Sequence, residues 1–447
     1  MTTAIASRGE RYASDYRALI ESFGSDGASW FTETREQAWA EFARLGFPTV
    51  RRGNELWKYT NVRPIDQAEF VHGAGEVEQV AADLVKSTCP WDDAWTTLTF
   101  VDGRFQERLS NLTKQAGLRA GSLADAMHSD RAAVELHLGR HAPYTGDAFR
   151  SLNTAFLTDG GFVQVDAGAE IEHPVHLLFI TSTSLASRAT YPRILWVSGE
   201  NSGATLIETY VNLAETAQLT DSVAEIVVGD GARVRHYRVQ IEHEKSHHIG
   251  IERIYQSGHS TYTSTSYATG PAVGRYDIHN LLDAPGGECT LHGLYLTTNR
   301  QHQSNEISTT HAKPRCTSHQ FFKGVLAGRS QAVFSGKVVV AVDAQKSVAA
   351  QKDLNLLLSH GAEIDTKPAL EIYADDVKAG HGATAGYVDP DAMFYMQSRG
   401  LSADEARAML VRGFVSEIVD EFEPEALHAY LERKTEEVMP ALLAAAD

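Results

Sequence analysis

One histidine stands out because of the residues on either side of it. His381 lies between Gly380 and Gly382, and these small neighbours leave room for other groups to approach its imidazole ring. A neutral imidazole is a common nitrogen ligand for iron and zinc, and it titrates near neutral pH. His381 is therefore a candidate metal ligand or proton relay. A histidine held in a core or a turn would show the same local pattern.

The densest group of histidines lies elsewhere, in the segment from His243 to His248. A metal site would require these side chains to converge on one ion. The polar composition of the segment favours a solvated turn between two strands instead. Further histidines are scattered along the strands that follow, at His279, His292, His302, His311 and His319.

The chain has only three cysteines, Cys89, Cys289 and Cys316, and their spacing is far from C-x-x-C. This number and spacing exclude a disulfide framework and a structural zinc site, and they indicate a reducing compartment. The first residues do not read as a secretory signal. The longest apolar runs, such as residues 338–342, are far shorter than the ~18 residues of a membrane span. We therefore expect a cytoplasmic protein that does not enter a membrane.

Other classes of function lack their signatures. The sequence contains no P-loop of the form G-x-x-x-x-G-K-[ST], so nucleotide hydrolysis by that route is not expected. The glycines of residues 380–386 have the wrong spacing for a dinucleotide-binding loop and do not follow a βαβ pattern. The net charge is −18, from 58 acidic and 40 basic residues, which argues against nucleic acid as a partner.

The elements that would position His381 differ along the chain. Residues 1–150 form an N-terminal, largely helical region with a mixed part after residue 60. Residues 151–395 carry short runs of β-branched and aromatic residues, for example 205–211, 234–241, 290–297 and 333–342. Residues 396–447 are helical again, beginning with the capping box Ser402-Ala-Asp-Glu405. In the first of these helices an apolar stripe is expected at Met409, Leu410, Phe414, Ile418 and Val419.

The strand region could be a long sandwich or a solenoid. No helix of about 10–15 residues interrupts it before residue 400, which excludes a βαβ fold. Successive strands lack clear two-residue hairpin turns, and this favours a parallel β-helix. We therefore predict a mainly β protein with a parallel β-helix core flanked by N-terminal and C-terminal helical regions.

An ordered series of sequence blocks between residues 311 and 417 carries a resemblance. The blocks are SQAVFSGK (330–337), AQKSVAAQ (344–351), NLLLS (355–359), AEIDTKPALE (362–371), HGAT (381–384) and MFYMQSRG (393–400). ELWKYT at residues 55–60 extends the likeness to the N-terminal region. With these blocks the chain resembles the SufB/SufD family of iron–sulfur cluster assembly proteins over most of its length.

The resemblance implies a scaffold subunit built on a right-handed parallel β-helix. Such a subunit pairs with a SufB-like paralogue through the ends of the β-helix. It binds a SufC-like ATPase through its C-terminal helices, where Arg399, Gly400 and Phe414 are the docking candidates. ATP would act only through that partner, sulfur would come from a SufS-type cysteine desulfurase, and a reduced flavin in the complex would supply electrons. The likeness of the interface edges would also allow a homodimer in the absence of the SufB-like partner.

The resemblance also gives His381 a role. The matching histidine of the family faces the partner's cysteine across the interface, where a nascent iron–sulfur cluster would be held jointly. His381 is thus the candidate metal ligand, with the alternative that the partner holds every cluster ligand and His381 only shapes the interface. Lys378, Gly380, Gly382 and Thr384 are candidates for the partner interface.

One position departs from the family pattern. SufB has a cysteine two positions before the matching histidine, as do many SufD chains, whereas this chain has Ala379. A thiolate is the usual iron–sulfur ligand, so this loop offers only the His381 imidazole. A SufD-like subunit is predicted, with a SufB-like cluster scaffold as the alternative. A sugar-acting β-helix enzyme is a third hypothesis, but neither a strict repeat nor a suitable carboxylate cluster is found. The sequence does not say whether Cys289 or Cys316 relays sulfur.

Overall fold

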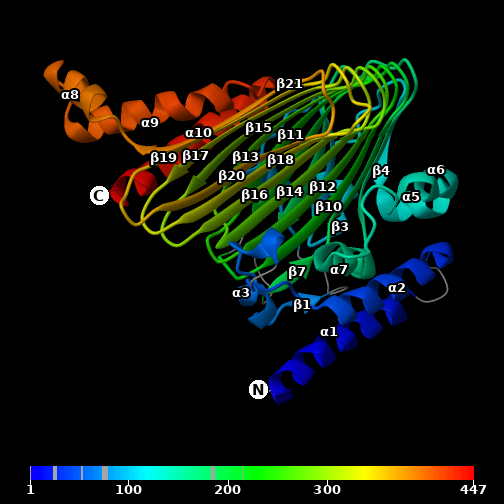
Figure 1. Ribbon diagram of the computed structural model, residues 1–447. Coiled ribbons are helices and arrows are strands. Elements are labelled where there is room, and N and C mark those ends of the chain that lie inside the picture. The colour runs from blue at the N-terminus through cyan, green and yellow to red at the C-terminus, as the bar shows by residue number, and fades with distance from the viewer. Residues whose placement is uncertain are drawn as a thin grey trace.

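The computed structural model describes residues 2–23, 28–51, 54–72, 79–182, 187–213 and 215–446. Two long parallel sheets lie face to face and form a β-solenoid with helices on its outer sides (Figure 1). This confirms the predicted parallel β-helix core with helical flanks.

Consecutive strands of the solenoid alternate between the two sheets. The first sheet contains β4 (Leu118–Ser122), β5 (Gly160–Val165), β8 (Arg193–Ser198), β10 (Leu219–Val228), β12 (His247–Gln256), β14 (Val273–Leu282), β16 (His302–His311), β18 (Gln331–Val340) and β20 (Glu363–Ile372), with β7 (Arg188–Thr190) and β1 (Val71–His72) at its margin. The second contains β3 (Arg104–Phe105), β2 (Thr96–Val101), β6 (Val175–Thr181), β9 (Gly203–Asn212), β11 (Arg233–Ile241), β13 (Thr261–Thr269), β15 (Glu288–Thr297), β17 (Thr317–Leu326), β19 (Val348–Leu357) and β21 (Lys378–Tyr387).

Each strand of the solenoid pairs in parallel with the strand one turn later. Val348 of β19, for example, pairs with Thr317 of β17 on one side and with Lys378 of β21 on the other. One turn takes about 30 residues, within the range of repeat proteins. All four predicted strand segments lie in such strands, except that 333–342 runs two residues past the end of β18.

Every second side chain of a strand points into the space between the two sheets and fills it. Phe334, Val338 and Val340 of β18 are buried, as their shared parity predicts, whereas Val342 lies beyond the strand and is exposed. The core between the sheets combines inward rows of both, including Phe322 of β17, whose ring centroid lies 5.3 Å from that of Phe334. The hydrophobic contact between the sheets therefore runs along the length of the solenoid.

Helices flank the solenoid, and several of them cover the outer faces of its sheets. They are α1 (Thr2–Phe23), α2 (Ser29–Leu45), α3 (Arg63–Gln67), α4 (Ala82–Thr88), α5 (Leu123–Ser129), α6 (Arg131–His137), α7 (Ala148–Phe156), α8 (Pro390–Ser398), α9 (Ala403–Val419) and α10 (Glu425–Ala444). Side chains of α1, α2 and α7 pack on β10 and β12 of the first sheet. Side chains of α9 and α10 pack on β9 to β17 of the second sheet.

The element boundaries differ in part from the sequence interpretation. The first 150 residues also contain β2 and β4, which belong to the solenoid sheets. At the other end β21 stops at Tyr387 and α8 begins at Pro390, a few residues before the expected boundary at 396. The capping box of Ser402 and Glu405 at the start of α9 is confirmed.

The expected apolar stripe on α9 is only partly right. Ile418 and Val419 are buried, but Met409 is exposed. Val411 and Val415 take its place against the second sheet, because the buried face of α9 is rotated relative to the stripe read from the sequence.

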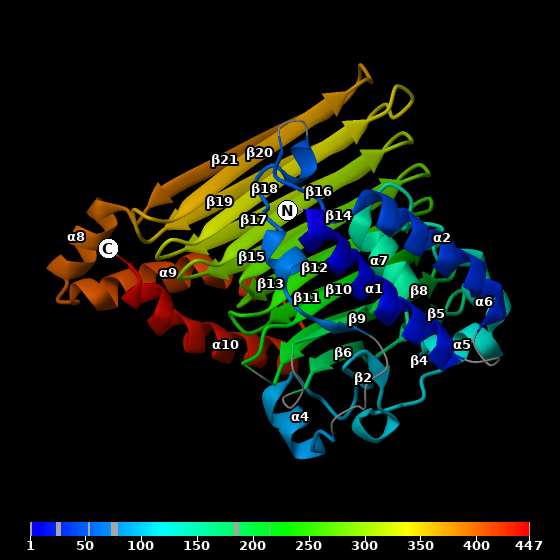
Figure 2. The same cartoon turned by 90° about the horizontal axis from the view of Figure 1, so that it is seen from below.

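The two ends of the solenoid are built differently. At the N-terminal end the sheets finish in short strands, β3 and β4, which pair antiparallel with β2 and β5. At the C-terminal end β20 and β21 are the last strands of their sheets, and each pairs on one side only among the described strands (Figure 2). Large apolar side chains are exposed at this open end, at Val342, Ile372, Tyr373 and Tyr387.

Among the described helices, none is long and apolar enough to cross a membrane.

The solenoid interior, rather than its open end, should hold the single chain together. We expect Phe322→Ala to lower the free energy of unfolding by about 3–5 kcal/mol, because it removes a fully buried ring and leaves a cavity. Tyr373→Ala, at a side chain that is 60% exposed, should cost less than about 0.5 kcal/mol. Guanidinium unfolding of both variants measures the difference, and equal losses would contradict this picture of the core.

Candidate functional site

His381 lies in β21, at the open end of the solenoid. In the register of β19 and β21 it pairs with Gln351, and the neighbouring positions of β19 alternate between buried Gln351 and Asp353 and exposed Lys352. Paired residues of parallel strands point to the same side of the sheet, so His381 belongs to the inward-facing row. It is exposed nevertheless, because no further turn of the described chain covers β21.

The other interface candidates of the sequence analysis lie in the same strand. Lys378, Gly380, Gly382 and Thr384 are all exposed along β21, so the structure places these candidates together on one edge. A Cβ atom built on Gly380 or Gly382 would have nothing within 4 Å. The fold of the single chain therefore does not require glycine at these positions, and the outer face of β21 at Gly380 and Gly382 is open to another molecule.

The three docking candidates of the C-terminal helices lie in two different places. Arg399 and Gly400 lie in the link between α8 and α9, and the Arg399 guanidinium stands 5.2 Å from the ring centroid of Tyr395. Phe414 is half-buried, and the Lys323 ammonium lies 4.3 Å from its ring centroid while also donating to the Phe414 carbonyl at 2.8 Å. Phe414 thus helps to hold α9 on the solenoid.

All three cysteines are buried and free of disulfides. Burial raises the pKa of Cys89 to about 12, and it also raises the pKa values of Cys289 and Cys316. Such thiols are protonated at neutral pH and offer no accessible thiolate to a metal.

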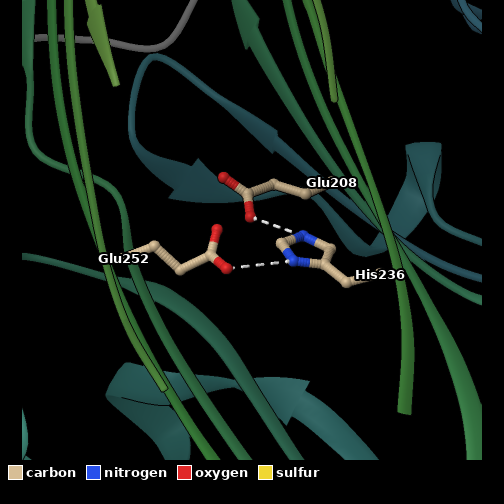
Figure 3. Close-up of side chains that lie close together, drawn as sticks. All are labelled: Glu208, His236 and Glu252. Carbon is tan, nitrogen blue, oxygen red and sulfur yellow. Dashed lines mark hydrogen bonds and ion pairs between the residues drawn. The ribbon is translucent and has the colours of Figure 1, made fainter. Parts of the chain in front are cut away.

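A group of charged side chains lies deep inside the solenoid, far along the chain from His381. His236 of β11 stands between two buried glutamates, Glu208 of β9 and Glu252 of β12 (Figure 3). Its Nε2 lies 3.1 Å from Glu208 Oε2, and its Nδ1 lies 2.8 Å from the hydroxyl of Tyr262 and 3.5 Å from Glu252 Oε1. Tyr262 and Tyr276 both donate their hydroxyls to Glu252.

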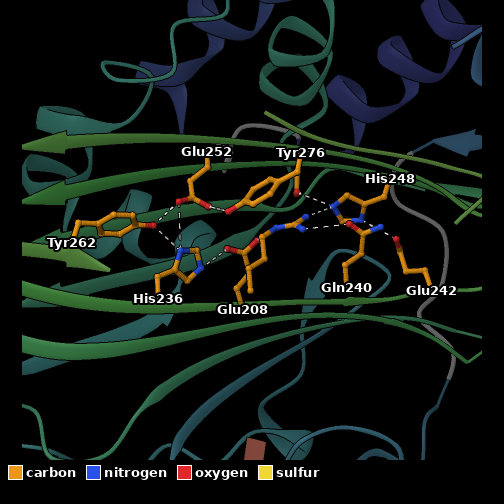
Figure 4. A network of polar contacts seen from close by, with 10 residues as sticks. Glu208, His236, Gln240, Glu242, His248, Glu252, Tyr262 and Tyr276 are labelled. Atoms are coloured by element: carbon orange, nitrogen blue, oxygen red, sulfur yellow. Dashed lines mark hydrogen bonds and ion pairs between the residues drawn. The ribbon is translucent and has the colours of Figure 1, made fainter. Parts of the chain in front are cut away.

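The contacts continue from this group to a second histidine (Figure 4). The buried Arg238 guanidinium lies 3.5 Å from Glu208 Oε1 and donates to His248 Nε2 at 2.6 Å. His248 in turn donates from Nδ1 to Glu242 at 2.9 Å. The guanidinium also stands 4.2 Å from the ring centroid of Tyr276. Burial lowers the pKa of His248, which fits a neutral ring that accepts from Arg238.

Charge balance explains how these groups can be buried. The Tyr262 hydroxyl donates to Glu252, so it must accept from His236 Nδ1, and both nitrogens of His236 are then donors. Burial alone would lower its pKa, but Glu252 and Glu208 raise it to about 9. Protonated His236 and Arg238 thus neutralise the two glutamates.

The same three residues have the ligand types of a metal site. Glu208, His236 and Glu252 bring ligand-type atoms within 4.8 Å of one another. A metal ion would need a free lone pair on His236 and would stand close to the Arg238 guanidinium. The arrangement suits a protonated histidine better than a metal ion, so we interpret it as a structural network.

Sequence comparison identifies the relatives of a chain with this fold. Residues 179–414 match the family described as SUF system FeS cluster assembly, SufBD core domain, and residues 6–177 match the SufBD protein N-terminal region. The chain belongs to the SufBD family.

Individual members of the SufBD family cover most of this chain. An iron–sulfur cluster assembly SufBD family protein of Synechocystis sp. is 31% identical over 377 residues, which is 82% of this chain and 83% of the relative. The iron–sulfur cluster assembly protein SufD of Escherichia coli is 30% identical over 395 residues, 88% of this chain and 89% of the relative. SufD of Bacillus subtilis is 25% identical over 296 residues.

Sequence reasoning missed the buried network of this SufBD chain. It interpreted the segment from His243 to His248 as a solvated turn, which is wrong for its last two residues: His247 and His248 open β12 and are buried. Parity offered only a partial signal, since Glu208 shares the inward parity of Leu206 and Tyr210 in β9, and His236 and Arg238 share that of Val234 in β11, while other apolar residues of β11 face outward. Charged residues at inward positions need partners, and that need predicts a network once the solenoid is known.

The protonated state of His236 should make the stability of the fold depend on pH. Its folded pKa is about 9 and exceeds the unfolded value near 6.5, so the stabilisation is full below pH ~6.5 and is lost as the pH rises through 9. We expect His236→Gln to cost about 2–3 kcal/mol more at pH 6.5 than at pH 9.5.

Guanidinium unfolding at the two pH values measures this difference. His381→Gln, at an exposed histidine, serves as the control and should cost less than about 0.5 kcal/mol. A cost of His236→Gln that is the same at both pH values would contradict a protonated His236.

Proposed function

We propose that this SufBD chain is a SufD-like scaffold subunit of a SufBCD-type complex that assembles iron–sulfur clusters. The observation that carries the proposal is the open end of the solenoid. There, β20 and β21 present strand edges that no other described strand pairs with, together with apolar side chains and His381. Unpaired edges of this kind are templates for the strands of another chain.

The partner at this end is a SufB-like paralogue, whose own solenoid would continue the sheets. Ile372, Tyr373 and Tyr387 would be buried between the two chains, while His381 faces the partner. The nascent cluster is the cargo of the complex and is held jointly. Thiolate ligands must come from the partner, because the three cysteines of this chain are buried and Ala379 stands beside the site. His381 contributes an imidazole nitrogen or relays a proton.

The SufC-like ATPase is assigned to α8 and the link to α9. Phe394 and Tyr395 of α8 are 72% and 60% exposed, and α8 has no buried residue. Arg399 and Gly400 lie beside them. An exposed aromatic pair next to an arginine has the composition of an interface hot spot. ATP hydrolysis belongs to this partner, sulfur comes from a SufS-type desulfurase, and we place the complex in the reducing cytosol.

The role of His381 is tested in the reconstituted complex. We expect His381→Ala to lower the yield of assembled cluster at least tenfold while the subunits still co-purify. The yield is measured by visible absorbance after addition of iron and a sulfide source. The control is His319→Ala, an exposed histidine on the outer row of β17. A cluster yield equal to that of the unsubstituted protein would refute the site.

The pairing surface is tested separately. Tyr373→Glu should prevent co-purification with a SufB-like chain, because it replaces an apolar ring by a carboxylate that would lose its hydration in the interface. Leu136→Glu on α6 is the matched control, since Leu136 is 62% exposed and lies far from the open end (Figure 2). Retention of the partner by Tyr373→Glu at the level of the control would contradict pairing through this end.

A further inference from the structure

Two arginines stand at equivalent positions of successive solenoid turns, at the corner where the chain passes from the second sheet to the first. Arg300 lies between β15 and β16, and Arg329 lies between β17 and β18. The register of β16 and β18 aligns the two corners, and the Arg329 amide donates to the Asn299 carbonyl at 2.7 Å. The residue before each arginine has a left-handed backbone, with φ 53° at Asn299 and 69° at Gly328. The two arginines therefore follow the same kind of turn, about 4.8 Å apart along the solenoid.

A glycine in the next turn opens a cleft over these arginines. Gly361, between β19 and β20, takes the position that corresponds to Arg329. A Cβ atom there would lie 2.7 Å from the Gly328 carbonyl oxygen and 3.1 Å from Arg329 Cγ, so a side chain at this position would press on Arg329. The cleft has a volume of about 510 Å³, it opens to solvent, and its lining residues are Arg300, Arg329, Gln331 and Gly361. A volume of this size is in the range of small-molecule sites.

The two arginines have no carboxylate partner in the described part of the chain. Neither forms an ion pair there, although the protein has 58 acidic residues against 40 basic ones and other exposed arginines pair with glutamates. Carboxylates of the same corner accept from amides instead: Glu363 from Gln331 Nε2 at 3.2 Å, and Glu244 from Asn299 Nδ2 at 3.1 Å. Two neighbouring guanidinium groups repel each other, and an anion bound between them would offset this repulsion.

We propose that Arg300 and Arg329 form an anion site that binds a diphosphate group. A guanidinium presents a rigid, planar set of donors that fits two oxygens of one phosphate. Two such groups, one solenoid turn apart, can each hold one of two linked phosphates. The space over Gly361 leaves room for the group that the diphosphate carries.

The cleft lies at the same end of the strands as α8. His360 precedes Gly361, and its Nδ1 lies 3.3 Å from the hydroxyl of Tyr387, the last residue of β21. α8 begins at Pro390, shortly after Tyr387 (Figure 2). An ATPase docked on α8, as proposed above, would release a nucleoside diphosphate close to this cleft. That source of the ligand rests on the proposed function, whereas the site itself depends only on the two arginines and the cleft.

Calorimetric titration of the full-length chain with pyrophosphate, at low salt and without divalent cations, tests the site. We expect one saturable site. Arg300→Gln and Arg329→Gln should each weaken it at least fivefold, and the double variant should show no saturable binding. Higher salt should weaken binding as well, because the attraction is between charges. Arg315→Gln, at an exposed arginine in the turn between β16 and β17, is the matched control and should bind pyrophosphate as the unsubstituted chain does.

Both arginines of the site are exposed, so neither substitution should change the thermal midpoint of the chain. The absence of a saturable site in the unsubstituted chain would overturn the proposal, as would an unchanged affinity in the double variant. Inorganic phosphate that binds as tightly as pyrophosphate would also overturn it, since a single phosphate would then be sufficient.

Titration with ADP distinguishes two sources of the diphosphate group. ADP that binds at least as tightly as pyrophosphate, and whose binding is lost in the double variant, identifies a nucleoside diphosphate as the ligand. Pyrophosphate that binds while ADP binds at least tenfold more weakly identifies the free anion. Both results support the site.

Co-purification separates this proposal from the proposed function. If the chain co-purifies with a SufB-like chain and a SufC-like ATPase but binds no pyrophosphate, the function stands and the anion site fails. If it binds pyrophosphate through the two arginines but retains neither partner, the anion site stands and the proposed function fails.

Discussion

The register between successive turns is the constraint on which the rest of the structure depends. Because each strand pairs in parallel with the strand one turn later, every inward residue stands above a fixed residue of the turn before. Gln320, Gln351 and His381 form one such column, and His236 stands in the same column several turns earlier. Leu291 lies between the two histidines, so the polar part of the column that leads to His381 begins only at Gln320.

The same constraint determines how polar groups can enter the interior. In the middle of the solenoid both sheets contribute, and two glutamates are neutralised by His236 and Arg238. Near the open end the opposite sheet presents Ile364, Thr366 and Pro368, none of which can neutralise Asp353. The interior thus changes from a network of balanced charges to the single buried carboxylate of Asp353, which accepts hydrogen bonds from Asn355 and Thr366 but has no ion-pair partner among the described residues. The change coincides with the end of the chain's own sheets, where another molecule can take part.

Much of the fold was predictable because it depends on local composition. The runs 205–211, 234–241 and 290–297 lie inside β9, β11 and β15, and the capping box at Ser402 begins α9. The columns were not predictable, since the turns differ in length and no fixed period aligns the strands. The buried network therefore escaped the sequence analysis. His248 was interpreted as solvated because the polar segment before it gave no sign that its ring turns inward to Arg238 and Glu242.

The difference between the two ends of the solenoid limits how large an assembly can become. A solenoid with two open ends could join others end to end without limit and form a fibre. Here one end finishes in the short antiparallel strands β3 and β4, so sheets can be continued in one direction only. If the chain pairs through its open end as proposed, that edge would be used up in both chains and strand continuation would stop at two subunits. The short antiparallel strands at the N-terminal end would then limit such an assembly to a closed pair.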